Sequence, residues 1–99
     1  MTEKRFDIGE FVNVETLQTV LENLAIRVRK RRKESGFSQR ELSNRSGVSF
    51  ASIRRFEALG EISLASLLKI GQALNCLADF NGLFKNPVIT SVKDYRHEN

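Results

Sequence analysis

The sequence predicts an all-α protein of five helices in one compact domain, because its apolar residues recur at helical spacing and serines stand where helices would start. Leu17, Leu21, Leu24 and Val28 follow one another at intervals of three and four residues, which places them on one face of a helix. Ninety-nine residues with 40% apolar content supply a single small core, and a second domain would not fit.

The first two helices are predicted on either side of a glycine. The first begins at about Asn13, a suitable cap, and ends near Gly36 after a run of basic residues, which suit the negative end of a helix dipole. The second covers residues 39–45, because Ser38 and Glu41 stand three positions apart, in the pattern of a capping box.

Serines also mark the next two helices. Ser49 is placed to cap a third helix that runs to about Leu59, and Ser63 is placed to cap a fourth that ends near Asn75. Apolar residues within 77–84 then predict one short closing helix.

We expect the domain to span residues 13–84, with short extensions at both ends. Residues 1–12 have no helical period, and either a disordered arm or a short strand fits them. Residues 85–99 form a C-terminal extension, in which the β-branched residues of 88–92 are typical of a strand.

Residues 38–60 have the features of two short helices joined by a tight turn at Gly47. The first helix must stop there in a left-handed backbone conformation, which costs a residue with a Cβ atom roughly 1 kcal/mol or more. Ser43 is small enough to let the helices approach. The apolar wedge that fixes their angle is expected to consist of Leu42, Val48, Ile53 and Phe56.

This pattern resembles the helix-turn-helix of the phage-repressor and Cro-like regulators, the XRE family, and the resemblance covers about residues 20–84. It rests on Gln39, Leu42, Ser43, Gly47, Val48, Ser49, Ile53, Glu57 and Gly60. Ser43 stands where the family usually has alanine, which is a conservative change in size. The resemblance implies a lambda-repressor-like DNA-binding domain, whose second motif helix enters the major groove.

The resemblance also implies which side chains contact DNA. It places the base-reading positions on Phe50, Ala51 and Arg55. The full set of expected DNA-binding residues, including those for phosphates, is Gln39, Arg40, Ser49, Phe50, Ala51, Ser52, Arg54 and Arg55. Arg55 suits O6 and N7 of guanine, and Phe50 and Ala51 suit a thymine methyl. Both base-reading assignments have an alternative. Arg55 is instead a solvated or phosphate-bound cation, or Phe50 instead packs against the domain or a partner.

Positive charge is concentrated around the motif. Residues 27–57 hold ten basic and three acidic residues, a balance of +7, whereas the rest of the chain sums to −3. Such an excess is typical of a surface that approaches phosphates. The basic run over 27–33 fits a solvated helix end, a phosphate clamp, or a site for a membrane surface or another acidic partner.

Several other functions are not indicated. The sequence has no apolar run long enough to span a bilayer and no secretory signal pattern, so we expect a cytoplasmic protein. Cys76 is the single cysteine and is expected in the core. No converging catalytic groups, phosphate loop, cofactor site or metal site is visible, and Glu57 is expected to pair locally with an arginine rather than act in catalysis.

The favoured hypothesis is a DNA-binding regulator, a repressor that reads palindromic operator DNA as a homodimer. Its dimer surface is expected to use residues 77–84 and 88–92. The alternative is an antitoxin that binds a toxin protein, because the domain resembles HipB-type antitoxins and such extensions often fold on a partner. The hypothesis of a membrane-surface protein ranks last, because it does not explain the glycine in the turn at position 47.

Overall fold

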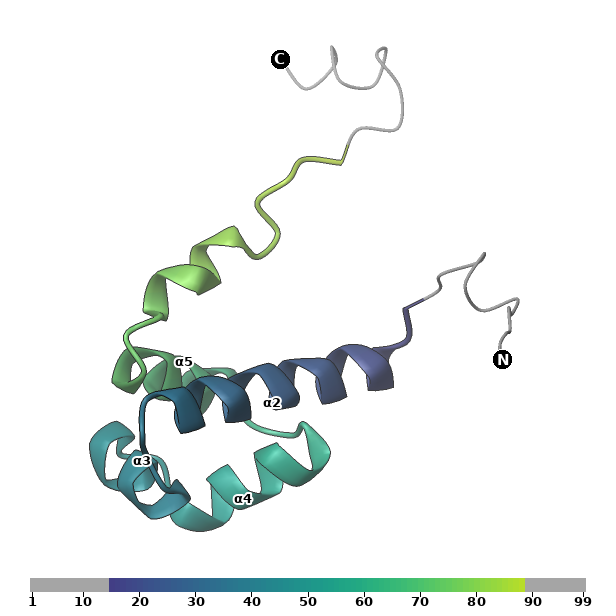
Figure 1. The fold of residues 1–99 in the computed structure, drawn as a ribbon. Coiled ribbons are helices and arrows are strands. Elements are labelled where there is room, and N and C mark those ends of the chain that lie inside the picture. The colour runs from purple at the N-terminus through teal and green to yellow at the C-terminus, as the bar shows by residue number, and fades with distance from the viewer. Residues whose placement is uncertain (1–14, 89–99) are drawn as a thin grey trace.

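The structure, a computed structural model, describes residues 15–88, and all the regular elements of this part of the chain are helices (Figure 1). No strand occurs within this part of the chain. The fold is all-α and lambda-repressor-like, which confirms the predicted fold class. Its elements are α2 (Leu17–Glu34), α3 (Gln39–Ser46), α4 (Phe50–Leu59), α5 (Leu64–Ala73) and the 3-10 helix η1 (Leu77–Gly82).

Helix α2 starts later than the sequence predicted. Its N-cap is Thr16, whose hydroxyl accepts a hydrogen bond from the backbone N–H of Thr19 at 3.0 Å. The hydroxyl of Thr19 in turn accepts one from the backbone N–H of Thr16 at 3.1 Å. The two threonines form a capping box without the usual glutamate or glutamine, so the prediction of a start at Asn13 was wrong. Asn13 itself lies outside the described residues.

The predicted caps of the next three helices are confirmed. Ser38, Ser49 and Ser63 each accept a hydrogen bond from the backbone N–H three residues ahead, at 3.0 to 3.1 Å. Helix α3 runs one residue beyond the predicted 39–45, and the closing helix is a 3-10 helix shorter than the predicted 77–84. The expected arm over 1–12 and most of the expected extension over 85–99, including 89–92, lie outside the described residues.

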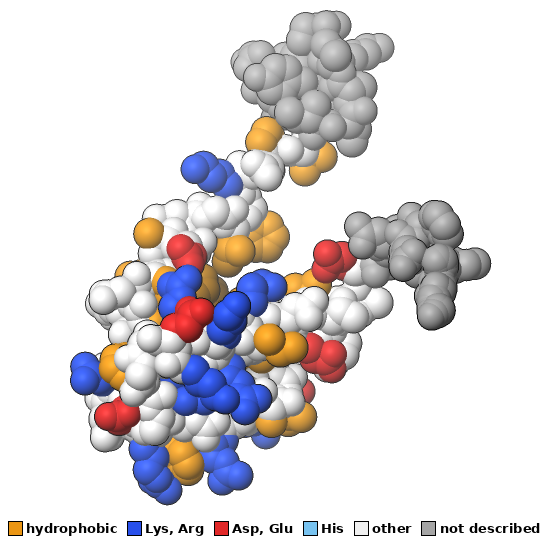
Figure 2. Space-filling model, in the orientation of Figure 1, with side chains coloured by type: hydrophobic (Ala, Val, Ile, Leu, Met, Phe, Trp, Pro, Cys, Tyr) orange, Lys and Arg blue, Asp and Glu red, His pale blue; other side chains and the backbone are white. Residues whose placement is uncertain are grey.

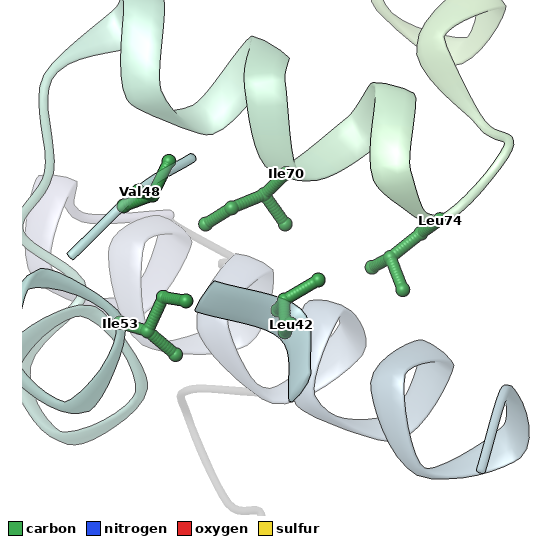
Figure 3. Close-up of a cluster of buried hydrophobic side chains, with 5 residues drawn as sticks. All are labelled: Leu42, Val48, Ile53, Ile70 and Leu74. Atoms are coloured by element: carbon green, nitrogen blue, oxygen red, sulfur yellow. The ribbon is translucent and has the colours of Figure 1, made fainter. Parts of the chain in front are cut away.

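The predicted wedge forms the centre of the core. Leu42, Val48 and Ile53 pack with Ile70 and Leu74 of α5 and its end, and all five are almost fully buried (Figure 3). A second cluster joins α2 to α4 and α5 through Ala25, Phe56 and Leu67. Cys76 is half-buried and packs against the first cluster. The core therefore fixes α4 from α2 on one side and from α3 and α5 on the other.

The turn between α3 and α4 is closed by Ser43 as well as by glycine. The Ser43 hydroxyl donates a hydrogen bond to the carbonyl oxygen of Val48 at 2.6 Å. Gly47 adopts a φ of 79°, in the left-handed region, and its N–H binds the carbonyl of Ser43. Ser43 therefore does more than allow α3 and α4 to approach each other, because its hydroxyl also connects the two ends of the turn.

Gly60 ends α4 with the same φ of 79° but in a crowded place. A Cβ atom at this position would lie 2.9 Å from both the Cβ atom and the carbonyl oxygen of Leu21 in α2. By contrast, a Cβ atom at Gly47 would meet no atom within 4 Å. The end of α4 is therefore seated directly against α2.

Element η1 leaves the bundle on the side of α5 that faces away from α4 (Figure 1). It contacts α5, and beyond it the chain extends outward. Large apolar side chains are exposed here, at Leu77, Leu83, Phe84 and Val88, which we call the C-terminal apolar patch. Over the described residues, no helix combines the length and apolar character that a membrane span requires.

The two left-handed glycines allow a matched test of this packing. Gly47→Ala should destabilise the fold by about 1 to 2 kcal/mol, because only the backbone conformation is strained. Gly60→Ala should cost roughly 1 to 3 kcal/mol more, since its Cβ atom would also collide with α2. Urea denaturation measures both free energies of unfolding, and equal losses would contradict the close contact with Leu21.

Candidate nucleic-acid interface

Helix α4 presents one face to the core and the other to solvent. Ile53 and Phe56 are buried, with exposed fractions of 0% and 1%, so their positions fix which side of the helix faces inward. Ala51, Arg54 and Arg55 are exposed on the opposite side, as the sequence predicted. The helix thus offers a row of exposed side chains on a backbone that is anchored in the core.

Phe50 brings together two of the expected DNA-binding arginines. The guanidinium carbon of Arg40, on α3, lies 4.0 Å from the centre of the Phe50 ring, and that of Arg54 lies 5.6 Å from it. Phe50 is half-buried, so it packs partly on its own domain. The negative face of an aromatic ring attracts such cations, and this holds Arg40 and Arg54 near the start of α4.

Arg55 is paired with Glu61, a residue for which the sequence predicted no role. Its Nη2 and Nε atoms both donate to Oε1 of Glu61, at 2.7 and 3.2 Å. The side chains are 65% and 54% exposed, so the pair lies in solvent. A shallow hollow of about 300 Å³ beside the pair is lined by Ser52, Arg55, Glu61, Ile62, Ser63 and Ser66.

Ser49 and Ser52 form a small polar cluster at the start of α4. The Ser49 hydroxyl accepts from the backbone N–H of Ser52 at 3.1 Å and donates to the Ser52 hydroxyl at 2.8 Å. Ser49 is exposed and Ser52 half-buried. Ser49 is the N-cap of α4 and Ser52 lies in its first turn, where backbone N–H groups favour an anion.

Beneath this surface lies a buried ion pair. Glu57 of α4 accepts hydrogen bonds from Nε and Nη2 of Arg32 in α2, at 2.7 and 3.0 Å. The Arg32 and Glu57 side chains are only 8% and 5% exposed, and Arg32 also donates to the carbonyl of Phe37 at 2.7 Å. The predicted pairing of Glu57 with an arginine is present, but the expectation of a local partner was wrong, because Arg32 lies 25 positions away on another helix.

Gln39 belongs to the same buried network. Its Nε2 donates to Oε1 of Glu57 at 2.9 Å, so this expected phosphate contact is oriented by the carboxylate below it. Glu57 thus receives hydrogen bonds from both α2 and α3. Burial alone would raise the pKa of Glu57, but hydrogen bonds from Arg32 and Gln39 and the charges of Arg32 and Arg29 outweigh burial and hold it below its ordinary value.

The basic run over 27–33 divides into buried and exposed members. Arg32 points into the core, because it lies on the same face of α2 as Ala25 and Val28. It is therefore a structural residue, and none of the three surface functions considered for the basic run applies to it. Arg29 is 56% exposed and lies 4.0 Å from Glu57. Lys and Arg side chains form several groups on the face shown in Figure 2, including the end of the bundle where α3 and α4 meet.

The order and geometry of these helices agree with a comparison to known families. A helix-turn-helix family model of the XRE type matches residues 28–80, more than half of the 99-residue chain. The chain belongs to this helix-turn-helix family. No curated protein and no solved structure matches it significantly. Membership of the family identifies a DNA-binding transcriptional regulator, and the matched residues contain α3, α4 and α5.

The buried ion pair predicts how stability depends on pH. Glu57 has a lowered pKa in the fold, so its ionised form stabilises the protein above the unfolded carboxyl pKa of about 4.3. That contribution is lost as the pH falls through the lower folded pKa. Glu57→Gln should therefore cost about 3 to 5 kcal/mol at neutral pH, because Arg32 is left buried and unpaired, and the cost should shrink in acid.

Denaturant titrations of the wild type and the variant at several pH values measure this difference. Glu34→Gln is the matched control, since Glu34 pairs with Arg31 at an exposed site and should contribute about 1 kcal/mol or less. A Glu57→Gln cost that stays constant from neutral to acid pH would contradict the assignment.

Proposed function

We propose that the protein is a sequence-specific repressor that inserts α4 into the major groove of its operator and blocks transcription by occupying a promoter. The observation that carries this proposal is the outer face of α4. It presents Phe50, Ala51, Arg54 and Arg55 while the opposite face is locked in the core. A helix held in this way enters a groove with little loss of conformational entropy.

The proposed contacts follow from the environment of each side chain. Arg55 would read guanine, while Phe50 and Ala51 would contact a thymine methyl. Arg40 and Arg54, stacked on Phe50, would bind phosphates on either side of the helix. Gln39, Ser49 and Ser52 would also contact the phosphate backbone, near the N-termini of α3 and α4 where backbone N–H groups are free.

We further propose that the protein acts in the cytoplasm as a two-fold dimer. One α4 covers only a few base pairs, whereas a dimer places two of them about 34 Å apart in successive turns of a palindromic site. The C-terminal apolar patch supports this proposal, because exposed apolar side chains gathered in one segment favour a protein contact.

The same patch also supports a second candidate function. A toxin protein in place of a second copy would make the chain an antitoxin that autoregulates its operon. Co-purification from the native host distinguishes the two, because an antitoxin would elute with its toxin. A chain that elutes alone, with no toxin gene beside its own, would favour the free-standing regulator.

Binding-site selection from random DNA tests the DNA-reading proposal. Arg55→Ala should relax the preference at one base by a factor of about 5 to 150, which corresponds to 1 to 3 kcal/mol. Arg40→Ala should weaken binding to all sequences alike and lower the salt dependence by about one phosphate contact. Binding that is absent or insensitive to salt would refute the proposal. If Arg40→Ala changed the preference at one base and Arg55→Ala weakened binding to all sequences, the base-reading and phosphate-binding roles of these residues would be exchanged.

The proposed dimer surface is tested by sedimentation. Phe84→Ser should shift the protein from dimer to monomer, because Phe84 is fully exposed in the single chain and would be covered in the dimer. Ile26→Ser, at another exposed apolar position on α2, should leave the dimer intact. A wild type that sediments as a monomer, or two variants with equal effects, would contradict this surface.

A further inference from the structure

The backbone on either side of Glu61 is held by the core. Gly60 is buried against Leu21, in a place where a Cβ atom would lie 2.9 Å from the Leu21 carbonyl oxygen. Ile62 is partly buried and packs against both core clusters. Glu61 therefore occupies a fixed position in a short turn, with its side chain directed to solvent beside α4.

Glu61 binds only one edge of the Arg55 guanidinium. A guanidinium is planar and has five N–H groups, which lie along separate edges. The Nε and Nη2 atoms share the edge that meets Oε1 of Glu61, at 3.2 and 2.7 Å. No hydrogen bond among residues 15–88 uses Nη1 of Arg55. Within this part of the chain, the edge formed by Nη1 and the second hydrogen of Nη2 therefore has no hydrogen-bond partner.

A free edge of this kind matches the acceptors of one base. Guanine presents O6 and N7 side by side in the major groove, and a guanidinium reads them with two parallel N–H bonds. Held at its other edge by a fixed carboxylate, Arg55 would meet guanine with less rotational freedom to lose than an unrestrained side chain. We propose that Glu61 is a positioning residue that orients Arg55 for guanine, an inference that rests on the proposed function.

The other arginines of the interface differ in this respect. Arg40 and Arg54 stack on the Phe50 ring, and none of the ion pairs in the described part of the chain includes either of them. Among the residues that the structure describes, no carboxylate lies beside Arg40 or Arg54 to weaken their attraction to phosphates. The negative charge of Glu61 lies beside Arg55, which weakens the attraction of Arg55 to phosphates of any sequence and leaves the directional contact with a base.

The test measures discrimination between a selected operator and the same operator with the Arg55-dependent guanine replaced. Glu61→Ala should lower that discrimination about two- to tenfold, through the added freedom of the arginine side chain. Glu61→Gln should retain most of it, because the amide oxygen can still accept from Nε and Nη2. In an Arg55→Ala background, Glu61→Ala should cause no further loss.

Glu34→Ala serves as the control, because it removes an exposed acidic residue that pairs with Arg31 and not with Arg55. Circular dichroism melting confirms that each variant is folded. The inference would be overturned if Glu61→Ala and Glu61→Gln both raised the affinity for the two DNAs by the same factor, whether Arg55 is present or replaced by alanine. That result would show only the loss of a negative charge. A guanine preference unchanged in Glu61→Ala would overturn it as well. Absence of DNA binding by the wild type would instead overturn the proposed function and this inference together.

Discussion

The arrangement of the interface depends on the buried ion pair between Arg32 and Glu57. Glu57 lies in the middle of α4, and its carboxylate is 5% exposed. Arg32 reaches it from α2 and Gln39 from α3, so one carboxylate connects all three helices. A buried charge without its partner is strongly unfavourable, which ties the position of α4 to that of both neighbours. Hydrophobic packing at Ile53 and Phe56 sets which face of the helix points inward, and the directional contacts at Glu57 tie that orientation to α2 and α3.

Arginine takes three distinct roles within this small domain, and the partner of each side chain decides which. Arg32 is buried against a carboxylate and is part of the fold. Arg40 and Arg54 lie against an aromatic ring, where they stay charged and accessible. Arg55 meets an exposed carboxylate that, within the described residues, leaves three of its five N–H donors unused. Net charge alone, although it marks the correct region of the chain, does not separate these roles.

The features that the sequence predicted correctly are local ones and those carried by hydrophobic periodicity, such as the buried wedge of Leu42, Val48, Ile53 and Phe56. Ser38, Ser49 and Ser63 cap helices through contacts with residues three positions away, and such spacing is visible in a sequence. Gly47 likewise marks its turn by its own backbone requirement. The start of α2 was missed because the capping box there uses a pair of threonines, a combination that the usual pattern does not include.

The contacts that were missed join residues distant in sequence or depend on the direction of a turn. Arg32 and Glu57 are 25 positions apart, and only the helical spacing of Arg32 with Ala25 and Val28 indicates that it points inward. Glu61 meets Arg55 because Gly60 reverses the chain, a geometry that no local pattern specifies. The structure gives the positions of the expected DNA-binding residues around α4, and their roles at DNA stay predictions.

The position of η1 has a consequence for assembly. It lies on the side of α5 away from α4, so the C-terminal apolar patch and the outer face of α4 do not overlap (Figure 1). A protein bound at the patch would leave α4 free, and both surfaces can be occupied at once. Two chains joined there would each raise the effective concentration of the other at the DNA, which increases avidity without a new contact to any base.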